Sequence, residues 1–181
     1  MNNNLILAST VLVLRDLNNK LEVLMVRRSK KPPFQNLHVF PGGKIDHGDS
    51  IKELEAFTDG INDEIASNIL GIEDGGLSFW IASIRECFEE VGILLAQKKS
   101  GEKLDFISSE KTKYENYRKM LVKNEINLLE ICQKEDLVLS TVNIAPLSHW
   151  ITPNIETKRF DTRFFIAYLP ENQVVQHDGM E

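Results

Sequence analysis

The sequence is short of cysteine, of long apolar segments and of basic charge, and each shortage excludes a class of protein. Its 181 residues include two cysteines, Cys87 and Cys132, in no metal-type spacing, which predicts reduced thiols and no disulfide framework. No apolar run approaches the ~20 residues that cross a bilayer. Lysine and arginine number 21 against 27 acidic residues, a net charge of −6, so we expect neither a membrane nor a nucleic acid as partner.

Targeting signals are also missing from both ends of the sequence. Residues 1–4 contain no basic segment, so residues 5–14 read as a strand and not as a signal peptide. Residues 179–181 match no peroxisomal or retention tail. We therefore expect a cytoplasmic protein.

The remaining pattern mixes strands and helices within a length that fits one domain, residues 1–181. Apolar runs predict strands at 5–14, 21–28, 37–40, 93–95, 148–152 and 159–169, and helical periodicity predicts helices at 51–57, 61–70, 78–91, 114–122 and 126–132. An asparagine-rich turn joins the first two strands as a hairpin. This mixture predicts an α/β or α+β sandwich with a mixed sheet.

The helix at 78–91 carries three carboxylates on one side. In the run R-E-C-F-E-E-V-G-I, Glu86, Glu89 and Glu90 stand at positions i, i+3 and i+4, within about 100° of one another on a helix. Apolar residues occupy the opposite side, and Gly92 suits a helix end. Like charges at this spacing destabilise a helix. The cluster therefore indicates a bound multivalent cation, although a solvated acidic face fits the spacing alone equally well.

A glycine pair upstream favours the cation. Gly42 and Gly43 end a short strand, where the missing side chains let backbone groups approach a ligand closely, and Asp49 follows six residues after Gly43. With the acidic helix, this pattern resembles the Nudix hydrolase signature, which reads G, five residues, E, seven residues, then R-E-U-x-E-E-x-G-U, where U is aliphatic. The matching positions are Gly43, Arg85, Glu86, Glu89, Glu90, Gly92 and Ile93.

Three features depart from that signature. Asp49 stands in place of its first glutamate, and Cys87 stands in place of an aliphatic residue. Ser50–Ile84 supplies 35 residues where the signature has seven, an excess of 28. We expect a single Nudix-type α/β/α sandwich with a helical insertion at about residues 50–78, lying at the mouth of the site.

An insertion at this point is similar to that of the peroxisomal coenzyme A diphosphatases within the Nudix family. Three segments resemble that subgroup: H-V-F-P-G-G at 38–43, E-E-V-G-I-L-L at 89–95 and R-F-D-T-R-F-F-I-A at 159–167. In those relatives a further strand and a terminal helix follow the point where this sequence stops. We therefore expect an exposed sheet face, with lowered stability or a homodimer formed through it.

The resemblance implies a diphosphohydrolase, or pyrophosphatase, that needs Mg²⁺, with Mn²⁺ as a substitute. Its metal ligands would be Glu86, Glu89 and Glu90 with the Gly43 carbonyl, and one carboxylate in or outside this set would act as general base. Arg85 would orient a glutamate, and Asp49 would accept a hydrogen bond from Arg85 in place of the usual glutamate. These five side chains are the candidate catalytic set.

The glycine pair and four arginines are candidate substrate contacts. The set comprises Gly42, Gly43, Arg27, Arg28, Arg159 and Arg163, although a solvated basic edge explains the arginines equally well. Trp150 and Tyr168 could stack on an adenine, but we expect both to pack in the core. The small-molecule substrate implied is coenzyme A or acyl-coenzyme A, cleaved to phosphopantetheine and adenosine 3′,5′-bisphosphate. The alternatives are a diphosphatase for ADP-ribose or a dinucleotide, and an inactive Nudix-like binding module.

Overall fold

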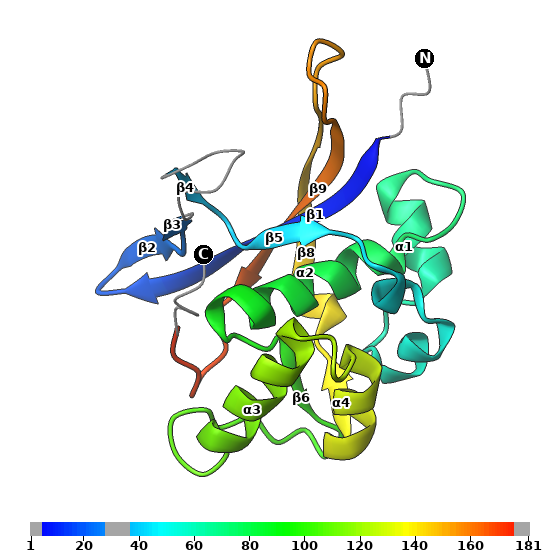
Figure 1. The fold of residues 1–181 in the computed structure, drawn as a ribbon. Coiled ribbons are helices and arrows are strands. Elements are labelled where there is room, and N and C mark those ends of the chain that lie inside the picture. The colour runs from blue at the N-terminus through cyan, green and yellow to red at the C-terminus, as the bar shows by residue number, and fades with distance from the viewer. Residues whose placement is uncertain (1–4, 28–36, 176–181) are drawn as a thin grey trace.

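A five-stranded mixed sheet forms the centre of the structure, a computed structural model that describes residues 5–27 and 37–175. Its strands are β1 (Ile6–Leu17), β2 (Lys20–Val23), β5 (Gly42–Lys44), β8 (Ile144–Ile151) and β9 (Phe160–Tyr168). The order is β2-β1-β9-β8, and β5 pairs with β1 alongside β2 (Figure 1). β1 and β9 run parallel while the other pairs are antiparallel, so the mixed sheet predicted from the sequence is present.

The first hairpin turns on two asparagines. Asn18 and Asn19 have φ angles of 53° and 60° between β1 and β2, a left-handed geometry that asparagine tolerates better than most residues. Two shorter antiparallel pairs stand outside the main sheet: β3 (Val26–Arg27) with β4 (His38–Val39), and β6 (Ala96–Lys98) with β7 (Leu137–Leu139). The asparagine-rich hairpin predicted from the sequence is therefore confirmed.

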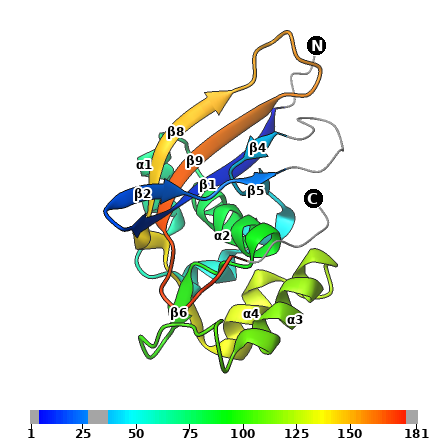
Figure 2. The same cartoon turned by 90° about the vertical axis from the view of Figure 1, so that its left-hand side faces the viewer.

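Helix α2 (Leu77–Val91) lies between the main sheet and a layer made by α3 (Lys111–Val122), α4 (Leu128–Glu135) and β6 (Figures 1 and 2). It ends where Gly92 adopts φ 73°, as the glycine predicts. Because it is covered from two sides, nearly all of its side chains are buried. Along the described residues, no helix is both long and apolar enough to cross a bilayer.

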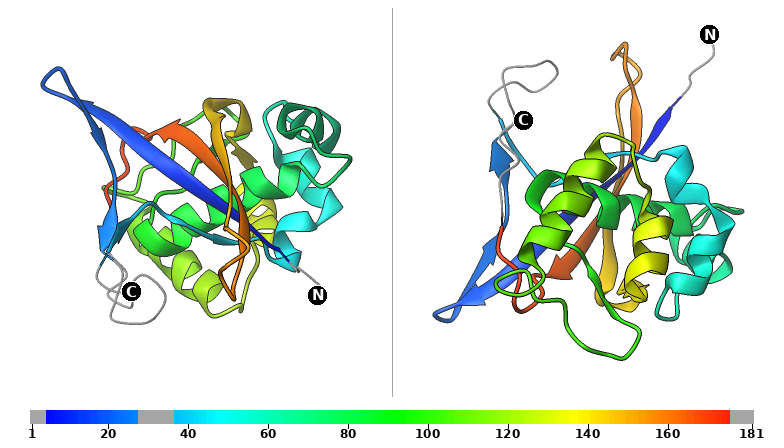
Figure 3. Two further views of the ribbon diagram at one scale, coloured as in Figure 1. Left: turned by 90° about the horizontal axis from the view of Figure 1, so that it is seen from above. Right: turned by 60° about the horizontal axis from the view of Figure 1, so that its bottom comes forward.

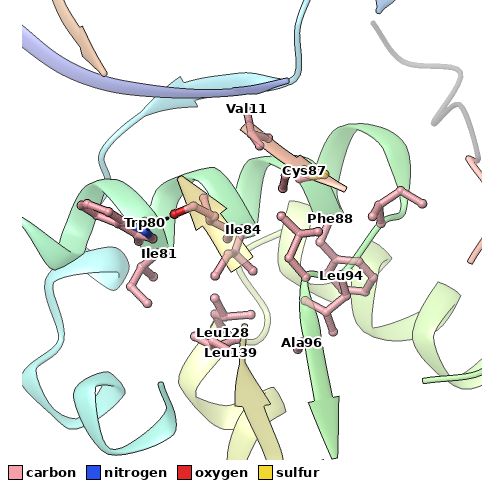
Figure 4. Close-up of a cluster of buried hydrophobic side chains, with 14 of the residues drawn as sticks. Val11, Trp80, Ile81, Ile84, Cys87, Phe88, Leu94, Ala96, Leu128 and Leu139 are labelled. Carbon is pink, nitrogen blue, oxygen red and sulfur yellow. Dashed lines mark hydrogen bonds between the residues drawn. The ribbon is translucent and has the colours of Figure 1, made fainter. Parts of the chain in front are cut away.

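The core is built around the apolar side of α2 (Figure 4). Trp80 packs against Phe165 of β9 with ring centroids 4.6 Å apart, and its Nε1 donates a hydrogen bond to the Ile144 carbonyl at 2.9 Å. Cys87 is fully buried beside Val11, and burial raises the pKa of its thiol well above the ordinary range. Cys87 is therefore a packing residue on the apolar side of α2.

The inserted segment lies at the N-terminal end of α2 (Figure 3). It forms the 3₁₀ turn η2 (Lys52–Phe57) and helix α1 (Asp63–Leu70), and it follows the 3₁₀ turn η1 (His47–Ser50), which carries Asp49. The Asp63 carboxylate accepts hydrogen bonds from the amides of Gly75 and Leu77 at 3.0 and 2.9 Å, which caps α2. None of residues 50–78 lines the cleft that holds Glu86 and Glu90, so the predicted position at the mouth of the site is wrong.

Two local predictions also differ from the structure. Residues 93–95 form no strand, because both backbone polar groups of Leu94 are taken by the buried Gln173 side chain, each at 2.9 Å; β6 begins at Ala96. Residues 52–57 coil as a 3₁₀ turn where the periodicity predicts a helix. A short turn of this kind has a period close enough to that of an α-helix to share its apolar pattern. A third 3₁₀ turn, η3 (Thr141–Asn143), precedes β8.

Candidate active site

A cleft of about 710 Å³ runs from the acidic side of α2 across one face of the main sheet. Side chains along β1 and β9 point alternately to the two faces of the sheet. Ala8, Thr10, Thr162 and Phe164 form the floor of the cleft. On the other face, Ser9 contacts Phe79 and Phe165 contacts Trp80, both of α2. The remaining lining residues are Met25, His38, Val39, Phe40, Gly42, Gly43, Lys44, Glu86, Glu90, Trp150, Ile151, Thr152, Pro153, Lys158 and Phe160.

The glycine pair gives the glutamates access to this cleft. The Glu86 carboxylate lies against Gly43 so closely that a Cβ there would overlap it, with Oε2 at 2.8 Å from the ideal Cβ position. The amide of Gly42 donates a hydrogen bond to Oε2 of Glu90 at 3.1 Å. The structure therefore brings together four of the predicted site residues: Gly42, Gly43, Glu86 and Glu90.

Arg85 is held by a buried ion pair with Asp49. Its Nε and Nη2 donate to the two carboxylate oxygens of Asp49 at 2.8 and 2.9 Å, and these side chains are 8% and 1% exposed. Its Nη1 donates to Oε1 of Glu86 at 2.9 Å and lies 3.4 Å from Oε1 of Glu89. The expected contact between Arg85 and Asp49 is present, so aspartate reaches the arginine where the signature has glutamate.

The carboxylates of α2 do not form a solvated acidic face. Glu86 and Glu89 side chains are only 13% and 21% exposed. Burial raises the pKa of Glu86 to about 7, and the nearby Arg85 guanidinium opposes this shift only in part. Burial likewise raises the pKa of Glu89, again against the effect of Arg85. Two largely buried carboxylates are stabilised in their ionised form by a nearby cation, and in this conformation that cation is Arg85.

In this conformation the same carboxylates interact with other groups of this protein. Among the described residues, no group of three or more histidine, cysteine, aspartate or glutamate side chains converges on one metal position. Glu86 and Glu89 face Arg85, and Glu90 faces the Gly42 amide. The donor set still fits a hard divalent cation, since it consists of carboxylate oxygens on consecutive turns of one helix. Coordination would require side-chain rotation away from Arg85.

The predicted arginines are scattered relative to the cleft. Arg27 is exposed on β3 opposite His38, and Arg28 lies outside the described residues. Arg159 donates from Nε to the Thr152 carbonyl at 2.9 Å, which braces the β8–β9 hairpin. Arg163 points to the opposite face of the sheet, where its Nη1 donates to the Leu70 carbonyl at 3.0 Å. None of the three described arginines lines the cleft.

Two aromatic residues expected in the core are exposed instead. Trp150 is 69% exposed on β8 and lines the cleft, while Tyr168 is 66% exposed at the end of β9 and lies outside it. Packing was the wrong prediction for both. Trp150 lies on the edge strand β8 and Tyr168 is the last residue of β9, and an isolated sequence reveals neither the edge of a sheet nor the end of a strand. The alternation of Phe160, Thr162 and Phe164 was the signal that could have identified the cleft floor.

Arg118 of α3 contacts the C-terminal turn of α2, and the sequence did not reveal this contact. Its guanidinium is buried and donates from Nε to the Glu89 carbonyl at 2.9 Å and from Nη2 to the Glu90 carbonyl at 2.8 Å. These are carbonyls of the last turn of α2, where a cation also complements the helix dipole. Arg118 thereby anchors the turn that carries two of the candidate metal ligands.

Comparison with solved structures agrees with this fold. A NUDIX hydrolase from Alicyclobacillus acidocaldarius aligns with a TM-score of 0.78 and 24% identity, covering 100% of this chain and 77% of that one. A MutT/nudix family protein from Enterococcus faecalis aligns with a TM-score of 0.50 and 15% identity, covering 98% and 41%. At these identities the two structures support the fold alone.

Sequence comparison identifies the family. The chain is 26% identical over 192 residues to the acyl-coenzyme A diphosphatase NUDT19 of Xenopus laevis, covering 88% of this chain and 50% of that protein. The chain thus spans half the length of this curated relative. A family model described as the NUDT19 Nudix domain matches residues 3–181. The subgroup predicted from the split signature is confirmed, and the chain belongs to the Nudix family with a NUDT19-type Nudix domain.

Proposed function

We propose that this chain is a Mg²⁺-dependent diphosphohydrolase that cleaves coenzyme A or acyl-coenzyme A to phosphopantetheine, free or acylated, and adenosine 3′,5′-bisphosphate. The observation that carries the proposal is the contact of Glu86 and Glu90 with the Gly42–Gly43 backbone at one end of a substrate-sized cleft. Membership of the NUDT19-type family, and the relative's name, support the choice of substrate.

Each part of the site has a role in this reaction. Glu86, Glu89 and Glu90, with the Gly43 carbonyl, would hold Mg²⁺ or Mn²⁺. The bound cation would neutralise diphosphate charge and make a coordinated water more acidic. Arg85, fixed by Asp49, holds the Glu86 carboxylate beside Gly43 in this conformation and would release it to the cation.

Water adds across the phosphoric anhydride in this scheme. Its oxygen bonds to one phosphorus, the bridging P–O bond breaks, and the bridging oxygen leaves with the other phosphate. A carboxylate of the site accepts the proton that the water loses. The backbone of Gly42 and Gly43, free of side chains, leaves room for the diphosphate beside Glu86 and Glu90.

A panel of diphosphates tests the proposal. The protein is incubated with Mg²⁺ and coenzyme A, acyl-coenzyme A, ADP-ribose or a dinucleotide, and the products are read by mass spectrometry. Release of adenosine 3′,5′-bisphosphate from coenzyme A supports the proposal. Preferred cleavage of ADP-ribose or of the dinucleotide would replace the substrate, and ligand binding without any cleavage would indicate an inactive binding module.

A further inference from the structure

The end of the cleft remote from the carboxylates is aromatic and carries one cation. We call Trp150, Phe164, Phe160 and Lys158 the aromatic end; all four line the cleft. The strand register ties this end to the glycine pair, because Lys44, Ala8, Thr162 and Trp150 are successive partners across β5, β1, β9 and β8 (Figure 2). Three strand spacings separate the two ends, about 14 Å, which an extended nucleoside diphosphate can span.

Trp150 presents a free surface for stacking. Its ring meets Phe164 edge-on, with centroids 6.3 Å apart and planes at 62°, and the side chain is 69% exposed. Any nucleobase can stack on such a ring, because every base has a π-face. Tyr168 is nearly as exposed but lies outside the cleft, so exposure by itself does not distinguish the two. What singles out Trp150 is its place on the cleft floor shared with Glu86 and Glu90.

Lys158 supplies positive charge next to this surface. Its Nζ lies 5.3 Å from the centroid of the Phe160 ring, and within residues 5–27 and 37–175 it forms no salt bridge with a carboxylate. A lysine in this position can meet a phosphate at little cost, because it gives up no carboxylate partner to do so. Coenzyme A differs from ADP-ribose and simple dinucleotides in carrying a phosphate on the ribose 3′ oxygen, close to its adenine.

We infer that the aromatic end binds the adenosine portion of the substrate, with adenine on Trp150 and the 3′-phosphate at Lys158. The inference rests on the proposed function, since it assumes that the diphosphate lies at Glu86 and Glu90. It makes Lys158 a specificity residue, which favours coenzyme A over the same molecule without its 3′-phosphate.

Steady-state kinetics with two variants test the inference. Trp150→Ala raises the KM for coenzyme A about tenfold and leaves kcat nearly unchanged, because it removes one stacking contact remote from the diphosphate. Tyr168→Ala is the matched control and keeps the wild-type KM. Lys158→Ala lowers kcat/KM for coenzyme A about tenfold and leaves that for 3′-dephospho-coenzyme A unchanged. Lys123→Ala, whose lysine is 67% exposed and outside the cleft, changes neither.

Fluorescence separates this inference from the proposed function. Trp80 is fully buried, so quenching by added adenosine 3′,5′-bisphosphate reports on Trp150, and it disappears in Trp150→Phe. Quenching in a protein that cleaves no diphosphate would defeat the proposed function and leave the subsite standing. Cleavage of coenzyme A with a wild-type KM in Trp150→Ala would defeat the subsite alone. An effect of Trp150→Ala that grows with acyl-chain length, without quenching by the bisphosphate, would assign the aromatic end to the acyl chain and also overturn the inference.

Discussion

Gly43 has no room for a side chain, because the Glu86 carboxylate lies against it. Gly43→Ala should push that carboxylate out of position and lower kcat for coenzyme A about a hundredfold, the cost of misplacing a catalytic group by about 1 Å. Gly48→Ala is the matched control, since nothing lies within 4 Å of its added Cβ. Initial rates and melting temperatures of both variants check the prediction. Equal rates for the two variants would contradict it.

The pair of Asp49 with Arg85 is buried, so breaking it should cost more than breaking a surface pair. Asp49→Asn leaves the guanidinium short of one charged partner in a site where its side chain is 8% exposed. We expect a loss of about 3 kcal/mol in the free energy of unfolding, measured by urea denaturation. Asp16→Asn, at an exposed position of β1, is the control. A loss below about 1 kcal/mol would mean that Glu86 and Glu89 suffice to balance Arg85.

At the residue scale, the sequence predicted contacts that depend on local spacing and missed those that depend on distant strands. The positions of Glu86, Glu90 and Gly43 follow from the helix period and the signature, and the structure brings them together. Trp150 was expected in the core because an apolar strand residue is usually buried. Its exposure results from the edge position of β8, which is set by the pairing of β1 with β9.

At the element scale, α3, α4 and β6 are joined by a polar cluster around Glu135. The carboxylate accepts hydrogen bonds from Lys113 at 2.5 Å, Tyr117 at 2.8 Å and Lys98 at 3.1 Å. Partial burial acts to raise the pKa of Glu135, but these three bonds outweigh it and hold the pKa below its ordinary value of 4.5. Ionised Glu135 therefore stabilises the fold above pH 4.5, and this contribution is lost as the pH falls through the lowered pKa.

Glu135→Gln should expose that pH dependence. At pH 7 the free energy of unfolding should be about 1 kcal/mol lower for the variant than for the wild type, because the uncharged glutamine loses the charge-assisted part of three hydrogen bonds. The difference should shrink steadily below pH 4.5, as followed by urea denaturation at a series of pH values. Glu125→Gln, at a position 54% exposed, should show no such trend. A difference that stays constant down to pH 3 would contradict the assignment.

Helix α2 shows why element predictions succeed in some places and fail in others. Its apolar period and the Gly92 stop are local signals, and both hold in the structure. The fate of residues 93–95 depends on Gln173, almost eighty positions away, whose side chain takes both backbone groups of Leu94. Because the inserted segment interrupts the signature, the sequence predicts that it lies at the mouth of the site. In three dimensions its return through Gly76 packs against Ser67 and fixes it to the start of α2.

At the scale of the whole molecule, the parallel pairing of β1 with β9 joins the two ends of the described chain. This long-range pair sets the cleft, since it lays Ala8 and Thr10 beside Thr162 and Phe164. Composition and hydropathy predict a mixed sheet but not which strands meet. The alternation along β9 marks Thr162 and Phe164 as one face of a strand, but it does not place Ala8 and Thr10 beside them. The expected homodimer likewise stays a prediction, which light scattering of the purified protein can check.

The central claim is that the acidic end of this cleft hydrolyses the diphosphate of coenzyme A with the help of a divalent cation. Its most direct test is the rate of adenosine 3′,5′-bisphosphate release from coenzyme A, followed by mass spectrometry with and without Mg²⁺, for the wild type and Glu90→Gln. We predict release of the bisphosphate only with Mg²⁺. The rate should be at least about a hundredfold lower in Glu90→Gln, because removing a metal ligand should cost no less than removing a residue that only supports one, which lowers activity by up to about a hundredfold. Release at the same rate without Mg²⁺, or an unchanged rate in a folded Glu90→Gln protein, would contradict the account.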